Sequence, residues 1–168
     1  LRPDTYVGST THSATKVLWT LPLEQHTAQP IPDARYSPAL VTILREVVDN
    51  AVDAAKKPRS RVRSIFVGLS PTGEVTVCQD GEAIPLERLE NGEYFPTKCF
   101  GEEFSGTNFV DDEETQRFGV GRNGIGCKAT NIFSKRFSVA IRNKVKSRWM
   151  AFSQDWADNM ETRSPVRI

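Results

Sequence analysis

A length of 168 residues fits one domain with a single hydrophobic core. The composition, with 38% hydrophobic and 26% charged residues, is ordinary for a globular protein. The net charge of +1 at pH 7 gives no support to an overall nucleic-acid coat or a membrane-surface protein and is otherwise uninformative. Three widely spaced cysteines and two histidines argue against a disulfide framework, a zinc ribbon and a histidine-rich metal site.

The first 36 residues indicate a loop-like entry followed by a short strand. The start, LRPDTYVGST, lacks an initiator Met and a signal-peptide pattern, and no apolar run approaches the length of a membrane span, so we expect an excised piece of an intracellular protein. Residues 12–23 predict a strand. Residues 24–36, which contain Pro30 and Pro32, predict a connection into the next element.

Residues 37–55 predict the helix around which the rest of the chain is organised. Ser37 and Pro38 are typical of an N-cap and a first helical residue, and apolar side chains follow at helical spacing. Glu46, Asn50 and Asp53 are separated by four and then three residues, which places them on one face beside the apolar stripe. This arrangement indicates a polar-lined pocket, although from the helix alone the simpler interpretation is a row of solvated side chains.

The segment after the helix combines a basic cluster with a hairpin. Residues 56–63 indicate a solvated loop or, alternatively, a contact with a phosphate backbone. Residues 64–69 and 74–79 predict two strands, and Asp80 follows the second one. Asp80 fits two roles: its carboxylate caps the turn, or it accepts a hydrogen bond from the exocyclic amino group of adenine.

Residues 100–128 carry most of the glycines that point to a ligand. Residues 100–120 lack periodicity, which is typical of a functional loop or lid. In GVGRNGIGCK, at residues 119–128, the glycine spacing lets backbone amides turn toward an anion, and residues 126–133 predict a helix whose first amides face phosphates. We reject a dinucleotide-binding loop because no strand precedes the pattern and no acidic residue follows at the required distance, and no Walker pair is present. The alternative interpretation of these glycines is a plain flexible loop without a ligand.

The last third predicts mainly strands. Residues 136–142 and 146–152 alternate between apolar and polar side chains, and residues 143–145 join them as a hairpin. Residues 154–160, QDWADNM, are polar around a central tryptophan. The three cysteines are most simply interpreted as buried free thiols, namely Cys78, Cys99 and Cys127.

Three motifs occur in the order seen in the GHKL ATPases: Glu46-x-x-x-Asn50, Asp80-Gly81-x-x-Ile84 and the glycine loop of residues 119–126. Within that family the chain most resembles the ATPase domain of type IIA DNA topoisomerases. RPDTYVGS, GRNGIGCKATNIFS and QDWADNM are similar to the eukaryotic-type enzymes, whereas EVVDNAVDAA looks more like bacterial gyrase. Certain viral topoisomerases show the same mixture.

The resemblance implies an α+β fold, a two-layer α/β sandwich in which helices cover one face of a mixed, mainly antiparallel sheet. Residues 1–168 would form one ATPase domain of a larger protein, without its transducer and DNA-cleavage domains. The implied cofactors are ATP and Mg²⁺. The implied location is an intracellular, DNA-containing compartment: the nucleus of a eukaryote, or the cytoplasm for a bacterial or viral protein.

The resemblance also assigns roles to single residues. Glu46 would be the general base that activates water, and Asn50 would bind magnesium through its amide oxygen. Asp80 would read adenine in a pocket shaped by Gly81 and Ile84. The full set expected to contact the nucleotide is Asn50, Asp53, Asp80, Gly81, Ile84, Gly106, Thr107, Asn108, Gly121, Arg122, Asn123, Gly124, Ile125, Gly126, Cys127 and Lys128.

Two departures from the family pattern matter. Ala83 replaces the second glycine of the adenine motif and adds a methyl group near the base, but we expect the site to survive. The family's catalytic lysine comes from the transducer domain, so we expect this chain to bind ATP and to hydrolyse it slowly or not at all.

The function implied is ATP-driven homodimer closure of a gate that captures double-stranded DNA for strand passage, with no membrane partner. We expect a monomer without nucleotide. One alternative is the ATPase clamp of a mismatch-repair or chaperone-like protein, and another is a degenerate module that binds without catalysis.

Overall fold

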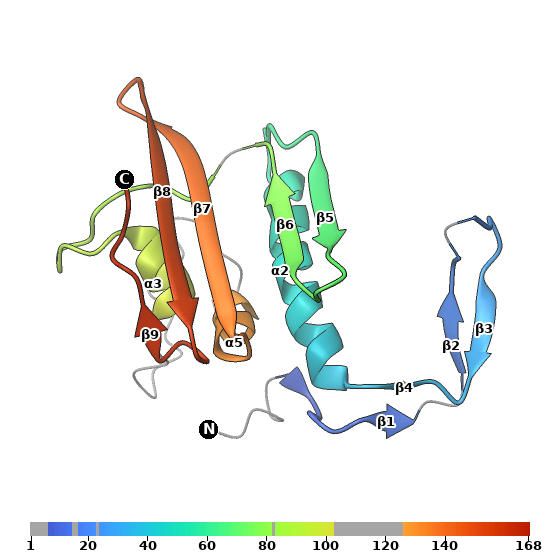
Figure 1. The fold of residues 1–168 in the computed structure, drawn as a ribbon. Coiled ribbons are helices and arrows are strands. Elements are labelled where there is room, and N and C mark those ends of the chain that lie inside the picture. The colour runs from blue at the N-terminus through green and yellow to red at the C-terminus, as the bar shows by residue number, and fades with distance from the viewer. Residues whose placement is uncertain (1–6, 15–16, 23, 82, 103–125) are drawn as a thin grey trace. The chain divides into compact units, whose positions relative to one another are not determined.

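The computed structural model describes residues 7–14, 17–22, 24–81, 83–102 and 126–168. The chain divides into two units, Leu1–Leu44 and Arg45–Ile168, and the boundary falls within helix α2 (Pro38–Lys56). Figure 1 labels the elements of both units. None of the described helices is long and apolar enough to cross a membrane.

The first unit contains short strands in two antiparallel pairs: β1 (Ser13–Ala14) with β4 (Arg35–Tyr36), and β2 (Val17–Thr20) with β3 (Gln29–Pro32). Two described strands with different partners, β1 and β2, lie within the residues 12–23 predicted as one strand, and the predicted connection itself contains strands. Pro30 lies opposite Trp19 within the β2–β3 ribbon. Each strand of a two-stranded ribbon has a free edge, where the missing N–H of proline costs no hydrogen bond. The two prolines are therefore compatible with a strand, although the sequence analysis interpreted them as signs of a connection.

Helix α2 begins as the sequence predicts. The Ser37 hydroxyl accepts a hydrogen bond from the Leu40 amide at 3.3 Å, which is the N-cap interaction. The Ser9 carbonyl accepts another from the Ala39 amide at 3.0 Å, and Gly8 turns the chain toward it with φ of +87°. The RPDTYVGS motif thus ends at the start of the helix and satisfies one of its free amides.

The second unit opens with the predicted hairpin, formed by β5 (Ile65–Leu69) and β6 (Val75–Gln79). The Gly73 amide donates to the Ser70 carbonyl at 2.9 Å, and Gly73 has φ of +82°, a value that glycine adopts without steric cost. Turn chemistry alone therefore places this hairpin correctly.

A larger antiparallel sheet follows. Its strands, in the order β7–β8–β9, are β7 (Arg136–Val145), β8 (Arg148–Ala157) and β9 (Thr162–Arg163). Helices α3 (Phe95–Gly101) and α5 (Gly126–Ile132) lie behind this sheet in Figure 1. Side chains along β7 and β8 alternate between inner and outer faces, as the sequence predicts for half-buried strands.

Aromatic side chains form the core between the sheet and these helices. Phe152 and Trp156 on β8 are each 1% exposed. Phe137 packs against Trp156 with ring centroids 6.1 Å apart, and Phe100 lies 6.1 Å from Phe137. Gly101 ends α3 directly against the Trp156 indole, where a Cβ would overlap the ring. The absence of a side chain at Gly101 therefore allows α3 to pack directly against β8.

The α+β fold with helices against antiparallel strands is confirmed. All pairings between described strands are antiparallel, and they form four separate sheets rather than one continuous sheet. The helices cover one face of the β7–β8–β9 sheet (Figure 1), which is the arrangement that buries its apolar side.

The turn of the β7–β8 hairpin lies three residues later than predicted. Lys146 and Ser147 form the connection, and both adopt positive φ, 45° and 68°. Two-residue hairpin loops favour such values because they match the twist of the strands, and Asn-Gly is their usual sequence. Because this hairpin has no Asn-Gly pair, the sequence pattern predicted the turn to begin at Asn143, which in the structure lies within β7.

Replacing Ser147 with glycine is expected to raise the free energy of unfolding by about 1 kcal/mol, since glycine has no steric penalty at positive φ. Thermal unfolding followed by circular dichroism measures the change. Gly73→Ala is the matched control in the other hairpin and should lower stability by a similar amount. A destabilised Ser147→Gly protein would contradict this account of the turn.

The QDWADNM motif has a structural basis. Its first half completes β8, and Asp158, Asn159 and Met160 all adopt positive φ, between 54° and 70°. Asp and Asn tolerate this region better than most residues. The Asn159 amide nitrogen then donates to the Ile132 carbonyl at 2.7 Å. The motif therefore anchors the end of α5, the helix that carries part of the candidate site.

Candidate functional site

Helices α2 and α5 bring four predicted residues together. The Asn50 amide nitrogen donates to the Glu46 carbonyl at 2.6 Å and to the Cys127 Sγ at 3.1 Å. Both amide hydrogens are thereby used, and the Asn50 Oδ1 accepts no hydrogen bond from the part of the chain that the structure describes. We call Glu46, Asn50, Gly126 and Cys127 the α2–α5 cluster.

Gly126 allows the closest approach within this cluster. A Cβ built on Gly126 would overlap the carboxylate of Glu46. An acidic side chain one helix away therefore occupies the space that a side chain at position 126 would need. The sequence alone assigned Gly126 to the phosphate loop and gave no indication of this contact.

The Cys127 thiol is shielded from solvent within the cluster. The pKa of Cys127 is raised to about 12, mainly by burial and also by the nearby Glu46 carboxylate, whereas the hydrogen bond from Asn50 acts in the opposite direction. Burial likewise raises the pKa of Cys99, on α3, to about 12. Both groups are neutral thiols at physiological pH.

The third cysteine corrects the prediction that all three thiols are buried. Cys78 lies on β6 and is exposed, because the two-stranded β5–β6 hairpin leaves that side chain uncovered. The three cysteines are free, as expected.

This difference predicts a reactivity order. Iodoacetamide should modify Cys78 well before Cys99 and Cys127, because the thiolate is the nucleophile and the latter two thiols are protonated and shielded. Mass spectrometry of peptides from the native protein after timed alkylation measures the order, and the unfolded protein serves as control. Modification of Cys127 as fast as Cys78 would be inconsistent with the α2–α5 cluster.

Asp80 forms a second group at the end of β6. Its Oδ1 accepts hydrogen bonds from the backbone amides of Arg63 at 2.8 Å and Ser64 at 3.0 Å. These amides hold the pKa of Asp80 below its ordinary value, so the carboxylate is ionised. The Asp80 carboxylate thus joins the end of β6 to the residues before β5 instead of capping its own turn, where the Gly81 amide donates to Gln79 Oε1. The Asp80 Oδ2 accepts no hydrogen bond from any described residue.

A surface hollow of about 450 Å³ adjoins Asp80, lined by Ser60, Arg61, Val62, Arg63 and Asp80. Gly81 borders it closely, since a Cβ there would overlap the backbone of Val62. The predicted basic cluster therefore lies beside the carboxylate that the sequence assigns to adenine.

Asn143 is a site residue that the sequence analysis missed. Its amide nitrogen donates to the carbonyls of Ala83 and Ile84, each at 3.4 Å, and so ties the predicted adenine motif to β7. The sequence pattern had predicted a turn at Asn143. The alternation of side chains could have revealed this role, because Asn143 shares the inner face of the strand with Ile141 and Val145.

The remaining predicted residues divide into two sets. Asp53 is exposed one turn beyond Asn50, and Lys128 is half-buried in α5. The other set lies outside the described residues and comprises Gly106, Thr107, Asn108, Gly121, Arg122, Asn123, Gly124 and Ile125. The described residues contain no group of three or more His, Cys, Asp or Glu side chains that could hold a metal ion by themselves.

Residues 36–149 match the family described as "Histidine kinase-, DNA gyrase B-, and HSP90-like ATPase", a span that includes all three nucleotide motifs. The chain belongs to this ATPase family. Its α2–α5 cluster and its Asp80 group are thus parts of an ATPase domain.

Among curated proteins, the chain is 35% identical over 170 residues to "Putative DNA topoisomerase 2, mitochondrial" of Caenorhabditis elegans, and 36% identical over 174 residues to "DNA topoisomerase 2" of Plasmodium falciparum. These alignments cover 100% of this chain and 14% and 12% of the relatives. The chain therefore spans about one seventh or less of their length.

Solved structures agree with the sequence relatives. The ATPase and transducer domains of DNA topoisomerase II from Balamuthia mandrillaris match with a TM-score of 0.82 and 32% identity, covering 99% of this chain and 41% of that one. The ATPase region of Saccharomyces cerevisiae topoisomerase II matches with a TM-score of 0.79 and 30% identity, covering 99% and 43%. The fold is therefore that of a topoisomerase II ATPase region.

Proposed function

We propose that this chain is the ATP-binding domain of a type II DNA topoisomerase, in which nucleotide binding drives dimer closure of a DNA gate for strand passage. The α2–α5 cluster is the observation that carries the proposal. It holds Asn50 near an acidic side chain with both amide hydrogens engaged, and no described residue donates to the amide oxygen. The names of the relatives favour a topoisomerase over a mismatch-repair or chaperone clamp.

Asn50 is the residue that would hold Mg²⁺. A hard divalent cation prefers oxygen ligands and keeps several waters, so one amide oxygen together with phosphate oxygens suits it better than a dedicated protein cage. The Oδ1 of Asn50, which accepts no hydrogen bond from a described residue, fits that requirement. When bound, the ion would neutralise charge on the phosphates of ATP.

Cys127 acts as a positioning residue for Asn50. Its sulfur accepts one amide hydrogen, which fixes which end of the amide group faces the nucleotide. Because the thiol stays protonated, it adds no negative charge that would compete with the phosphates.

Glu46 is the proposed general base. Its carboxylate would orient the attacking water and take up a proton from it, which requires an unobstructed approach. Gly126 makes room for the carboxylate itself, because a side chain at this position would fill the space of the carboxylate.

Asp80 is the proposed adenine reader. Its Oδ1 is occupied by two backbone amides, so the ionised Oδ2 is the atom that would accept the exocyclic amino hydrogen. A guanine would present a carbonyl there and leave two acceptors facing each other. Asn143 holds the backbone of Ala83 and Ile84, so it would keep the added methyl group in a fixed place at the base pocket.

The proposed partners are a second copy of the chain and duplex DNA, and the proposed location is an intracellular compartment that contains DNA. The test is sedimentation of the chain with and without a non-hydrolysable ATP analogue and magnesium. We expect a monomer that becomes a dimer only with nucleotide, and an Asn50→Ala variant that stays monomeric. Dimerisation that ignores nucleotide, or no dimer at any nucleotide concentration, would contradict the proposed gate.

A further inference from the structure

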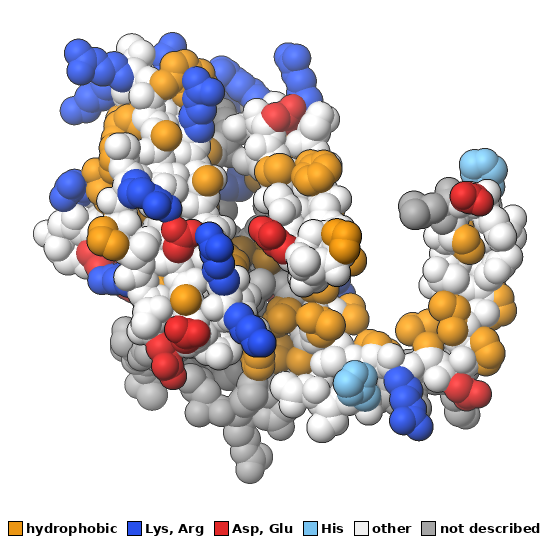
Figure 2. Space-filling model, in the orientation of Figure 1, with side chains coloured by type: hydrophobic (Ala, Val, Ile, Leu, Met, Phe, Trp, Pro, Cys, Tyr) orange, Lys and Arg blue, Asp and Glu red, His pale blue; other side chains and the backbone are white. Residues whose placement is uncertain are grey.

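The β7–β8 hairpin concentrates positive charge at one end. Residues 135–149 contain no Asp or Glu, in a chain whose net charge is only +1, and their six cationic side chains are Lys135, Arg136, Arg142, Lys144, Lys146 and Arg148. Figure 2 shows Lys and Arg side chains gathered over the free end of this hairpin. We define the basic tip as Arg142, Lys144, Lys146, Arg148 and Trp149.

All members of the basic tip face solvent. Arg142 and Lys144 lie on the outer face of β7, Lys146 lies in the turn, and Arg148 is the first residue of β8. None of the four cations forms an ion pair with an acidic side chain in residues 7–14, 17–22, 24–81, 83–102 and 126–168. Within the described part of the chain, no carboxylate is paired with these charges.

Trp149 gives the tip an ordered centre. It is 64% exposed, and the Arg142 guanidinium lies over its ring, 4.9 Å from the centroid. Such a cation–π contact fixes the direction of an otherwise mobile arginine. Lysine on an edge strand also prevents aggregation, but that role does not require an exposed tryptophan beneath an arginine.

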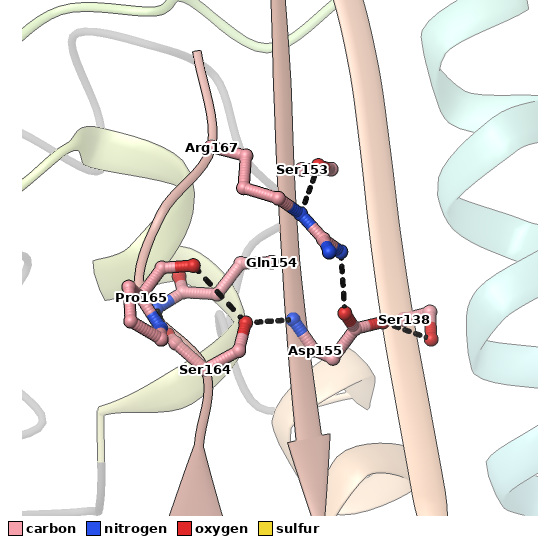
Figure 3. A network of polar contacts seen from close by, with 7 residues as sticks. All are labelled: Ser138, Ser153, Gln154, Asp155, Ser164, Pro165 and Arg167. Carbon is pink, nitrogen blue, oxygen red and sulfur yellow. Dashed lines mark hydrogen bonds and ion pairs between the residues drawn. The ribbon is translucent and has the colours of Figure 1, made fainter.

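The one acidic residue on β7 and β8 is neutralised at the other end of the hairpin. Asp155 forms an ion pair with Arg167 at 2.7 Å and accepts a hydrogen bond from Ser138 at 2.6 Å, as Figure 3 shows. Both partners lower the pKa of Asp155 and keep its charge engaged locally. It therefore does little to offset the field of the basic tip.

We propose that the basic tip binds the phosphate backbone of double-stranded DNA, an inference that rests on the proposed topoisomerase function for its choice of partner. Outward residues on one strand repeat at about 6.8 Å, close to two steps of the 3.4 Å phosphate rise along each strand of a duplex. A rigid hairpin suits a rigid row of phosphates. Arg142 covers one face of Trp149, which leaves the ring poorly placed to stack on bases of a single strand.

The test is fluorescence anisotropy of a labelled DNA duplex titrated with the 168-residue chain between about 50 and 200 mM salt. The hairpin variant carries Lys144→Gln, Lys146→Gln and Arg148→Gln. The matched control carries Lys56→Gln, Lys57→Gln and Arg59→Gln in the other basic segment and has the same net charge. Circular dichroism and binding of an ATP analogue verify that each variant is folded.

We expect the hairpin variant to bind the duplex at least about tenfold more weakly at low salt and to reduce the slope of log affinity against log salt by about 2 to 3. The control should retain the wild-type slope. Equal losses in both variants, no binding by the wild type, or tighter binding of a single strand would each overturn the inference. If the wild type binds the ATP analogue but not DNA, the inference about the basic tip is wrong and the proposed function is unaffected. If it binds DNA but not the analogue, the proposed function is wrong and the inference about the basic tip is unaffected.

Discussion

Replacing Gly126 with alanine is expected to weaken binding of a magnesium–ATP analogue by about 10- to 100-fold, the range typical of residues that support metal ligands. The new Cβ would occupy the space of the Glu46 carboxylate and push it away from its place in the α2–α5 cluster. Calorimetric titration measures the affinity.

The same substitution is expected to lower stability by about 1–3 kcal/mol through overpacking, although helix propensity alone would favour alanine over glycine by about 1 kcal/mol. Gly92→Ala is the control: its φ is +84°, but no atom lies within 4 Å of the added Cβ. That variant should lose stability through backbone strain alone and keep the wild-type nucleotide affinity. Unchanged affinity in Gly126→Ala would show that Glu46 does not lie where the structure places it.

Replacing Trp156 with alanine is expected to lower the free energy of unfolding by about 3–5 kcal/mol, a large part of the total stability of a domain. The side chain is 1% exposed and fills the space between the β7–β8–β9 sheet and α3. Chemical denaturation gives the free energy and shows whether much of the variant is already unfolded without denaturant.

Trp149→Ala is the matched control, since it removes the same side chain from the opposite face of the same strand. Trp149 is 64% exposed, so its loss should change stability by no more than about 0.5 kcal/mol. Similar losses in both variants would mean that the inner face of β8 is not the core.

Features that depend on local chemistry could be predicted from the sequence. The N-cap at Ser37, the periodicity of α2 and the β5–β6 turn each rest on side chains close to one another in the chain. The spacing of Glu46 and Asn50 likewise fixes their common helix face. The α+β fold was predicted from the family resemblance, and the relatives and the structure confirm it.

Features that depend on contacts between distant segments could not be predicted. The Cys127 sulfur meets Asn50 across 77 residues of sequence, and no pattern within either helix reveals the contact. Asn143 was misplaced because Lys146 and Ser147 adopt positive φ without a glycine to mark the turn. Cys78 was expected inside because cysteine is usually buried, but its position in a two-stranded hairpin leaves it exposed.

The most direct test of the nucleotide site is calorimetric titration of a non-hydrolysable ATP analogue, with and without magnesium, into the wild type and Asn50→Ala. The account predicts that the wild type binds more tightly with magnesium and that Asn50→Ala loses this dependence, because it lacks the oxygen proposed as the metal ligand. Asp80→Asn, in the separate adenine group, should weaken binding and keep the magnesium dependence. An Asn50→Ala protein with the wild-type magnesium dependence, or a wild type that binds no analogue, would contradict the central claim.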